Sequence, residues 1–124
     1  MGDDVRVADT SFLYAVLSTS DRFHDAAAAE AVKPDPILIP AEIFSETLAL
    51  VQYRRGFKTA KEAGGWLRAQ RGVQIAPSSA SILERAWSLF VRRRGRVSYP
   101  DAVVLSWCAS LRATPLAYDK GITG

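Results

Sequence analysis

Apolar positions along the chain alternate between short runs, two of them interrupted by one polar residue, and longer stretches with a spacing of three and four residues. The short runs are typical of buried strands, and the longer stretches are typical of helices that bury one face. Strands are therefore predicted at residues 5–8, 37–39, 73–75 and 116–118. Helices are predicted at residues 9–17, 24–32, 40–54, 59–70, 79–94 and 98–111.

Strands that alternate with helices predict a parallel sheet with helices on both faces. We expect an α/β fold, a three-layer α/β/α arrangement around a central and mainly parallel sheet. Residues 1–124 form a single domain on this interpretation, with no linker or repeat. In such sheets the ligand crevice lies beyond the carboxyl ends of the strands. Residues that directly follow a strand are therefore the first candidates for function.

Two of the predicted helices carry distinctive sequence signals. Residues 59–62 (Thr-Ala-Lys-Glu) fit a capping box that would begin a helix at Thr59. The segment from Ala102 to Leu111 is apolar nearly all round, which predicts a helix buried on more than one side.

Four acidic residues occupy positions that bring them toward one edge of the predicted sheet. Asp9 follows the first strand and Asp119 follows the last; Glu46 lies near the second turn of a helix, and Asp101 lies in the first turn of another. Several carboxylate oxygens suit a hard divalent cation such as Mg²⁺ or Mn²⁺, which activates water and stabilises charge on a phosphodiester. Taken singly, each residue has a structural alternative as a helix cap, a turn residue or a solvated side chain.

The composition excludes several other kinds of site. One cysteine, Cys108, and one histidine, His24, rule out an internal disulfide and a zinc site of the usual Cys/His type. Both are predicted to be structural. No apolar stretch is long enough to cross a bilayer, and the acidic start lacks the basic region of a signal peptide. A soluble protein with a cytoplasmic location, and no membrane partner, is expected.

Basic residues are clustered although the net charge is only +3. One cluster comprises Arg92, Arg93, Arg94 and Arg96, and another comprises Arg54, Arg55 and Lys58. Such clusters can contact the phosphates of RNA, and we predict RNA binding for the first. The alternative is a solvated helix end, where cations are favoured by the helix dipole.

Four short motifs resemble those of PIN domains, in the order in which that family has them. They are Val7-Ala8-Asp9-Thr10-Ser11-Phe12-Leu13, the segment from Ile39 to Leu48 with Pro40-Ala41 and Glu46, Ser98-Tyr99-Pro100-Asp101-Ala102, and Leu116-Ala117-Tyr118-Asp119-Lys120-Gly121. The match spans almost the whole chain. The small one-domain layout is most similar to VapC toxins, ribonucleases that are paired with a VapB antitoxin.

The resemblance implies a Mg²⁺- or Mn²⁺-dependent endoribonuclease, with Asp9, Glu46, Asp101 and Asp119 as catalytic and metal-binding residues. Thr10 and Ser11 are implied to supply hydroxyl support beside the metal. RNA, a VapB-type antitoxin and a second copy of the chain are the implied partners. The sequence departs from the family at Ala117, where Thr or Ser is frequent, and at Gly124, where relatives usually continue through another short strand. Either the domain is truncated there or it lacks that edge.

An apolar cleft near the first helices is the expected docking surface for the antitoxin, because an amphipathic partner helix fits such a groove. The apolar residues that motivate this expectation are Phe12, Leu13, Tyr14, Val16, Phe44 and Leu48.

Other functions remain open at this point. A PIN-like module that only binds RNA or protein is one alternative, which the Ala117 departure supports. A DNA nuclease with the same metal chemistry is another. A receiver-type signalling domain shares the doubly wound fold, but it needs a phosphoacceptor Asp after the middle strand, and residues 73–77 contain none.

Overall fold

A computed structural model describes residues 4–118, and within this range four strands form one parallel sheet. The strands are β1 (Arg6–Ala8), β2 (Ile37–Pro40), β3 (Val73–Ala76) and β4 (Thr114–Leu116), in the spatial order β3-β2-β1-β4. Arg6 pairs with Ile37 on one side and with Thr114 on the other. The strands β1 and β2 are buried along their whole length, which explains why β2 is an uninterrupted apolar run, whereas β1 contains the buried Arg6.

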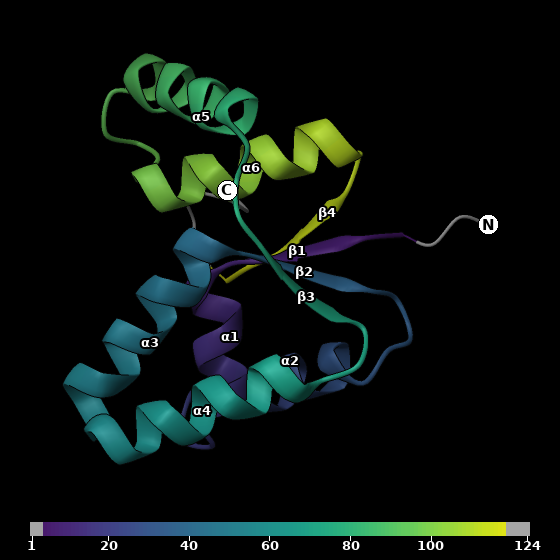
Figure 1. Ribbon diagram of the computed structural model, residues 1–124, viewed down its shortest axis with the longest axis vertical. Helices are drawn as coiled ribbons and strands as arrows, with labels where there is room; N and C mark the ends of the chain where they lie inside the picture. Colours follow the sequence, from purple (N-terminus) through teal and green to yellow (C-terminus); the bar gives the residue numbers. More distant parts are fainter. Residues whose placement is uncertain (1–3, 119–124) are drawn as a thin grey trace.

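Helices cover both faces of the sheet (Figure 1). One face carries α1 (Thr10–Leu17), α2 (His24–Ala31), α3 (Ala41–Arg55) and α4 (Phe57–Ala69), and the other carries α5 (Ala80–Arg93) and α6 (Tyr99–Leu111). The three-layer α/β/α arrangement with a parallel sheet is therefore confirmed. None of the helices in residues 4–118 is long and apolar enough to cross a membrane.

The helix α6 is buried on two sides, as its sequence predicts. Val104 and Cys108 belong to the main core beneath the sheet, whereas Ala102 and Val103 pack with Ala86 of α5 in a second core cluster. The helix α5 has α6 as its main neighbour, so only a narrow stripe of α5 is buried. Trp87, at the edge of that stripe, consequently remains 56% exposed.

The helix α4 begins two residues earlier than predicted. Its first residue is Phe57, and its N-cap position is Gly56, with no side-chain capping bond, so the capping box at Thr59 is wrong. Gly56 has φ of +90°, a conformation that favours glycine, and it joins α3 directly to α4. The tight α3–α4 corner, rather than a side-chain cap, sets where α4 begins.

The last strand also lies earlier than predicted, at Thr114–Leu116 rather than residues 116–118. Pro115 lies in its middle, and proline is normally avoided in strands because it lacks an N–H. Here the N–H of Thr114 donates to Val5, and the carbonyl of Leu116 accepts from Asp9. The alternating pattern points the Pro115 nitrogen away from β1, so the strand loses no hydrogen bond.

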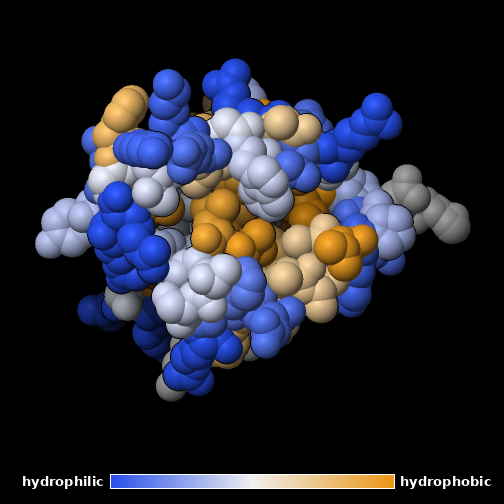
Figure 2. Space-filling model, turned by 90° about the horizontal axis from the view of Figure 1, so that it is seen from below, coloured by the Kyte–Doolittle hydropathy of each residue, from blue (hydrophilic) through white to orange (hydrophobic). Residues whose placement is uncertain are grey.

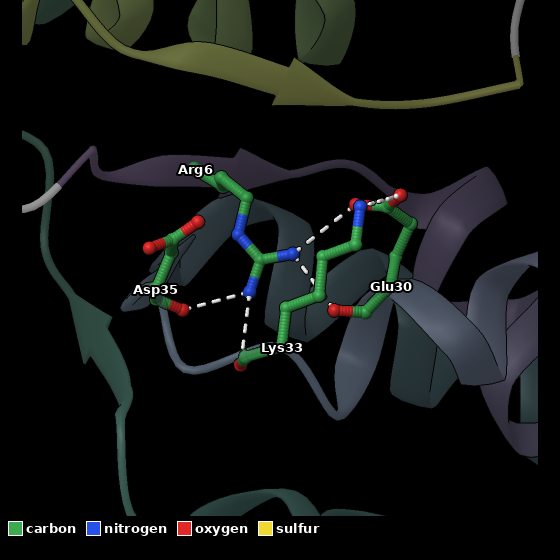
Figure 3. A network of polar contacts seen from close by, with 4 residues as sticks. All are labelled: Arg6, Glu30, Lys33 and Asp35. Carbon is green, nitrogen blue, oxygen red and sulfur yellow. Dashed lines mark hydrogen bonds and ion pairs between the residues drawn. The ribbon is translucent and has the colours of Figure 1, made fainter.

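Arg6 anchors the segment that connects α2 to β2, although it lies on a central strand and is only 5% exposed. Its guanidinium donates to the carbonyls of Glu30 at 2.8 Å and Asp35 at 2.7 Å. A weaker contact reaches the Lys33 carbonyl, and Glu30 Oε1 lies 3.3 Å away (Figure 3). Backbone carbonyls thus satisfy most of this buried charge, which a carboxylate alone would not.

The apolar residues proposed for antitoxin docking do not form one exposed surface. Phe12 and Leu13 are 1% and 2% exposed and belong to the main core, so this part of the prediction is wrong. Tyr14, Val16, Phe44 and Leu48 are half-buried. Figure 2, seen from below, shows hydrophobic side chains gathered in a hollow that hydrophilic residues surround.

Candidate active site

A cleft of about 450 Å³ opens at the carboxyl ends of the parallel strands, where the topology predicts a ligand crevice. Asp9, Glu46 and Asp101 all line it, together with the hydroxyl residues Thr10, Ser11 and Ser98. Asp119 lies outside the described residues. Three of the four predicted carboxylates are therefore brought together in one cleft.

Asp9 is held by hydrogen bonds from its own helix. It is the N-cap of α1, and its Oδ1 accepts from the Phe12 N–H at 3.0 Å and from the Ser11 hydroxyl at 2.7 Å. The carboxylate is nearly buried, at 3% exposure for the residue. Asp9 thus both caps α1 and lines the cleft. A role as a helix cap therefore does not exclude a role in the candidate active site.

Ser11 links Asp9 to the end of β4. Its hydroxyl donates to Asp9 and accepts from the Tyr118 N–H at 2.8 Å. Tyr118 directly precedes Asp119 in the chain. The Ser11 hydroxyl therefore fixes the position of Asp9 relative to the residue that leads into the fourth carboxylate.

Asp101 lies in the first turn of α6 and is 7% exposed. The hydroxyl of Ser98, the N-cap, accepts from the Asp101 N–H at 3.2 Å. This is the N-cap hydrogen bond that a serine at this position typically makes. Ser98 therefore orients the turn that carries Asp101 toward the cleft.

Glu46 reaches the cleft from α3 and is exposed, unlike Asp9 and Asp101. The Thr10 hydroxyl, in the first turn of α1, donates a hydrogen bond to Glu46 Oε1. Thr10 and Ser11 thus each bind one of the cleft carboxylates, and their support beside a metal stays a prediction.

Helix ends add positive potential to the cleft. The helices α1 and α3 follow β1 and β2 directly, and α6 begins at Ser98, which also lines the cleft. The N-terminal ends of three helices thus lie at the same edge of the sheet (Figure 1). Each helix N-terminus carries about half a positive charge, which stabilises carboxylates and phosphates nearby.

The donor set fits a hard divalent cation by its chemistry. Carboxylates and hydroxyls line the cleft, and its described lining contains neither histidine nor cysteine. Between residues 4 and 118, however, no three acidic, histidine or cysteine side chains are arranged to hold an ion by themselves. The fourth predicted ligand, Asp119, lies outside this range.

Two arginines that the sequence did not single out for the site line the same cleft. Arg54 lies 5.0 Å from the ring centre of Tyr14, and Arg22 lies 4.7 Å from that of Phe23. Arg54 had a recognisable signal, because Glu46, Leu50 and Arg54 follow each other every four residues on one face of α3. Arg22 had none, because it lies in the α1–α2 connection.

Two tyrosines that line the cleft have pKa values shifted in opposite directions. The Arg54 guanidinium beside Tyr14 lowers the pKa of its phenol. Burial, and then the carboxylates of Glu30 and Asp21, raise the pKa of Tyr118.

The predicted RNA-binding cluster lies outside the cleft. Arg92, Arg93, Arg94 and Arg96 are all exposed, at the end of α5 and in the connection to α6. None of them lines the cleft. Their role in RNA binding stays a prediction.

His24 and Cys108 have structural positions, as predicted. His24 donates from Nδ1 to the Ala15 carbonyl at 2.7 Å and joins α2 to α1. Cys108 is 9% exposed in the main core, and burial raises the pKa of its thiol to about 11.

This pKa predicts that Cys108 resists alkylation. Because the thiolate is the nucleophile, iodoacetamide should react slowly with the native protein at pH 8 and faster only as the pH approaches 11. The neutral thiol is favoured in the fold, so its contribution to stability is complete below pH 9 and is lost between pH 9 and about 11. Mass spectrometry of the alkylated protein measures the rate, with guanidinium-unfolded protein as the control. Equal rates for both would contradict this.

Comparisons with known proteins agree with the fold. A family model described as the PIN domain matches residues 6–123. Among solved structures, VapC20 of Mycobacterium tuberculosis, a sarcin–ricin loop-cleaving toxin, is 26% identical with a TM-score of 0.84, over 95% of this chain and 92% of that one. No curated protein sequence matches the chain.

Two further structures are similar in fold alone. A toxin–antitoxin complex from Klebsiella pneumoniae is 22% identical with a TM-score of 0.66, over 96% of this chain and 91% of that one. VapBC2 from Rickettsia felis, bound to a DNA fragment from its promoter, is 11% identical with a TM-score of 0.69, over 93% and 88%.

Proposed function

Since the chain belongs to the PIN domain family, we propose that it is a metal-dependent endoribonuclease and the toxin of a VapBC-type toxin–antitoxin pair. It hydrolyses RNA phosphodiester bonds at a site formed by Asp9, Glu46, Asp101 and Asp119. Similarity to VapC20, a toxin that cleaves RNA, supports this choice over a DNA nuclease.

One observation carries the proposal. Asp9 and Asp101, from different ends of the chain, are both nearly buried and line one cleft with Glu46. Buried carboxylates are costly unless hydrogen bonds or a cation balance them. Hydrogen bonds to Oδ1 orient Asp9, and the three helix N-termini favour a bound phosphate. A fold needs no such arrangement for its stability.

In this proposal, the four carboxylates would hold Mg²⁺ or Mn²⁺, which would supply an activated water and a positive charge beside the phosphate. Ser11 binds both the Asp9 carboxylate and the backbone of Tyr118, just after β4, and Thr10 binds Glu46 at the cleft. The N-terminal turns of α1 and α6 place Asp9 and Asp101 at the cleft.

The proposal includes partners and a location. A VapB-type antitoxin binds the protein, as in the toxin–antitoxin complexes that share its fold. The half-buried residues Tyr14, Val16, Phe44 and Leu48 are candidates for its contact surface. The protein forms a homodimer and acts in the cytoplasm, where RNA and the antitoxin are both present.

The proposal predicts cleavage that depends on a divalent metal. Purified protein should cleave an RNA hairpin with the sarcin–ricin sequence, or another structured RNA, with added Mg²⁺ or Mn²⁺, and EDTA should stop the reaction. The carboxylate-rich cleft without described sulfur or imidazole ligands is the reason. Gel analysis of labelled RNA during metal titration measures this.

The same assay separates the alternatives. A single-stranded DNA of the same sequence serves as the control, and faster cleavage of that DNA would favour a DNA nuclease. Tight RNA binding without cleavage at any metal concentration would favour the inactive binding module. Cleavage that persists in EDTA would contradict the metal mechanism.

A further inference from the structure

We propose that Arg22 and Arg54 bind the phosphates that flank the cleaved bond, and that the aromatic rings of Phe23 and Tyr14 hold the two guanidinium groups in place. This inference rests on the proposed ribonuclease function. It assigns the RNA path to the walls of the cleft rather than to the exposed arginines at the end of α5.

Arg54 lies on the face of α3 that carries Glu46. The two residues are eight positions apart, so Arg54 is about 12 Å farther along the helix axis. Its guanidinium lies 5.0 Å from the ring centre of Tyr14, from the neighbouring helix α1. Arg54 is thus too far along the helix to act at the scissile phosphate, but it meets a strand that continues along α3.

Arg22 lines the same cleft from the connection between α1 and α2. Its guanidinium lies 4.7 Å from the ring centre of Phe23. Phe23 stacks in turn on Tyr118, with ring centres 4.4 Å apart and an angle of 5° between the planes. Because Ser11 binds the backbone of Tyr118, this stack connects Arg22 to the group that positions Asp9.

Within the part of the chain that the structure describes, neither arginine forms an ion pair with a carboxylate. The two ion pairs found between residues 4 and 118 both use Glu30, which pairs with Arg6 and Lys33. Asp21 also lines the cleft, but its Oδ1 accepts from the Phe23 N–H. Two exposed guanidinium groups, ordered on aromatic rings and facing a cleft, are suited to bidentate contacts with phosphate.

The alternative is that each arginine merely covers an aromatic ring. Cation–π contacts at exposed sites are common and do not need a ligand. What favours RNA is that both pairs line the one cleft that holds the carboxylates. Arg92, Arg93, Arg94 and Arg96 are equally basic, yet they do not line it.

The test compares RNA affinity at several salt concentrations, on an Asp9→Asn background so that cleavage does not interfere. The probes are a fluorescein-labelled sarcin–ricin hairpin and a labelled single-stranded RNA of mixed sequence. Each phosphate contact to a single strand contributes about 0.7 to the slope of log affinity against log salt. At 0.1 M salt, one such contact therefore contributes a factor of about five to the affinity. Arg22→Gln and Arg54→Gln should each lower the RNA affinity by about this factor, and the double variant should lower it by the product of the two factors.

Arg85→Gln is the matched control, because Arg85 is an exposed arginine on α5 that does not line the cleft. A variant with Gln at positions 92, 93 and 94 tests the competing cluster. In the active protein, the double Arg22→Gln, Arg54→Gln variant should raise KM and leave kcat nearly unchanged, since neither residue touches the reacting atoms. Thermal unfolding verifies that each variant is folded.

The outcomes separate this inference from the function on which it rests. Failure of the parent protein to bind or cleave either RNA would overturn both. Cleavage by the parent, with the double variant behaving like Arg85→Gln, would overturn the inference alone. Unchanged RNA affinity with a changed molecular mass in light scattering would assign the arginines to a contact between copies, and would also overturn it.

Discussion

Asp9→Asn and Asp101→Asn are each expected to reduce RNA cleavage by about 100-fold or more, because loss of even an outer-shell partner costs 10–100-fold at a metal site. Both substitutions keep the size and hydrogen-bonding shape of the side chain but remove a charge. The charge is what a divalent cation requires in this cleft. Rates under single-turnover conditions, at saturating Mn²⁺, measure the loss.

A matched pair of variants at Asp9 separates catalysis from capping. Asparagine caps a helix about as well as aspartate, so Asp9→Asn should unfold at nearly the same temperature as the parent. Asp9→Ala also loses the bonds from Phe12 and Ser11, and it should cost about 1 kcal/mol of stability. Both variants should be inactive, although only the alanine variant should be destabilised.

Asp21→Asn is the control for charge in the cleft. Asp21 lines the same cleft, but it holds the turn before α2 through the Phe23 N–H, a bond that asparagine can also make. Cleavage should therefore stay within a few-fold of the parent. If Asp21→Asn were as inactive as Asp9→Asn, loss of any negative charge would explain the result. If Asp9→Asn stayed active, Asp9 would be a cap and nothing more.

Arg6→Met should have the largest effect on stability, a loss of about 3 kcal/mol, because two buried carbonyls would each lose a short, charge-assisted hydrogen bond. Methionine retains most of the apolar stem, so the loss reports the guanidinium rather than a cavity. Urea unfolding at pH 7, followed by circular dichroism, measures the change.

Glu30→Gln is the matched control on the other side of this contact. The Glu30 side chain is 34% exposed, and Lys33 is the first cause of its lowered pKa. Screened ion pairs of this kind contribute about 0–1 kcal/mol. Removing the charge leaves both backbone carbonyls bound to Arg6, so little stability should be lost. Equal losses for Glu30→Gln and Arg6→Met would mean that the ion pair, not the carbonyl contacts, stabilises this segment.

The sequence predicted the order of the elements because short apolar runs alternate with helical spacing along the chain. It predicted that Asp9 and Glu46 converge because a parallel sheet brings the residues that follow its strands to one edge. Asp101 follows a helix, and its place was predicted from a motif that resembles those of PIN domains. The register of β4 was not predictable from local pattern, since pairing with β1 outweighs the poor strand propensity of Pro115. The start of α4 was missed because Gly56 turns the chain directly from α3 into α4.

Side-chain contacts between distant segments could not be predicted from the sequence for the same reason. When α1 is considered alone, Phe12 and Leu13 look like apolar residues left exposed on the surface, but the sheet and the neighbouring helices bury both. The stack of Arg22, Phe23 and Tyr118 joins residues almost one hundred positions apart, and no local period encodes it.

The pairing of β1 with β4 also determines when the active site can exist during synthesis. Arg6 and Thr114 are partners in the sheet, and the N–H of Asp9 donates to the carbonyl of Leu116. Asp9 leaves the ribosome early, but its partners are made more than one hundred residues later. A nascent chain that lacks β4 therefore cannot form this edge of the sheet, and the cleft is completed only after residues 114–116 have been made.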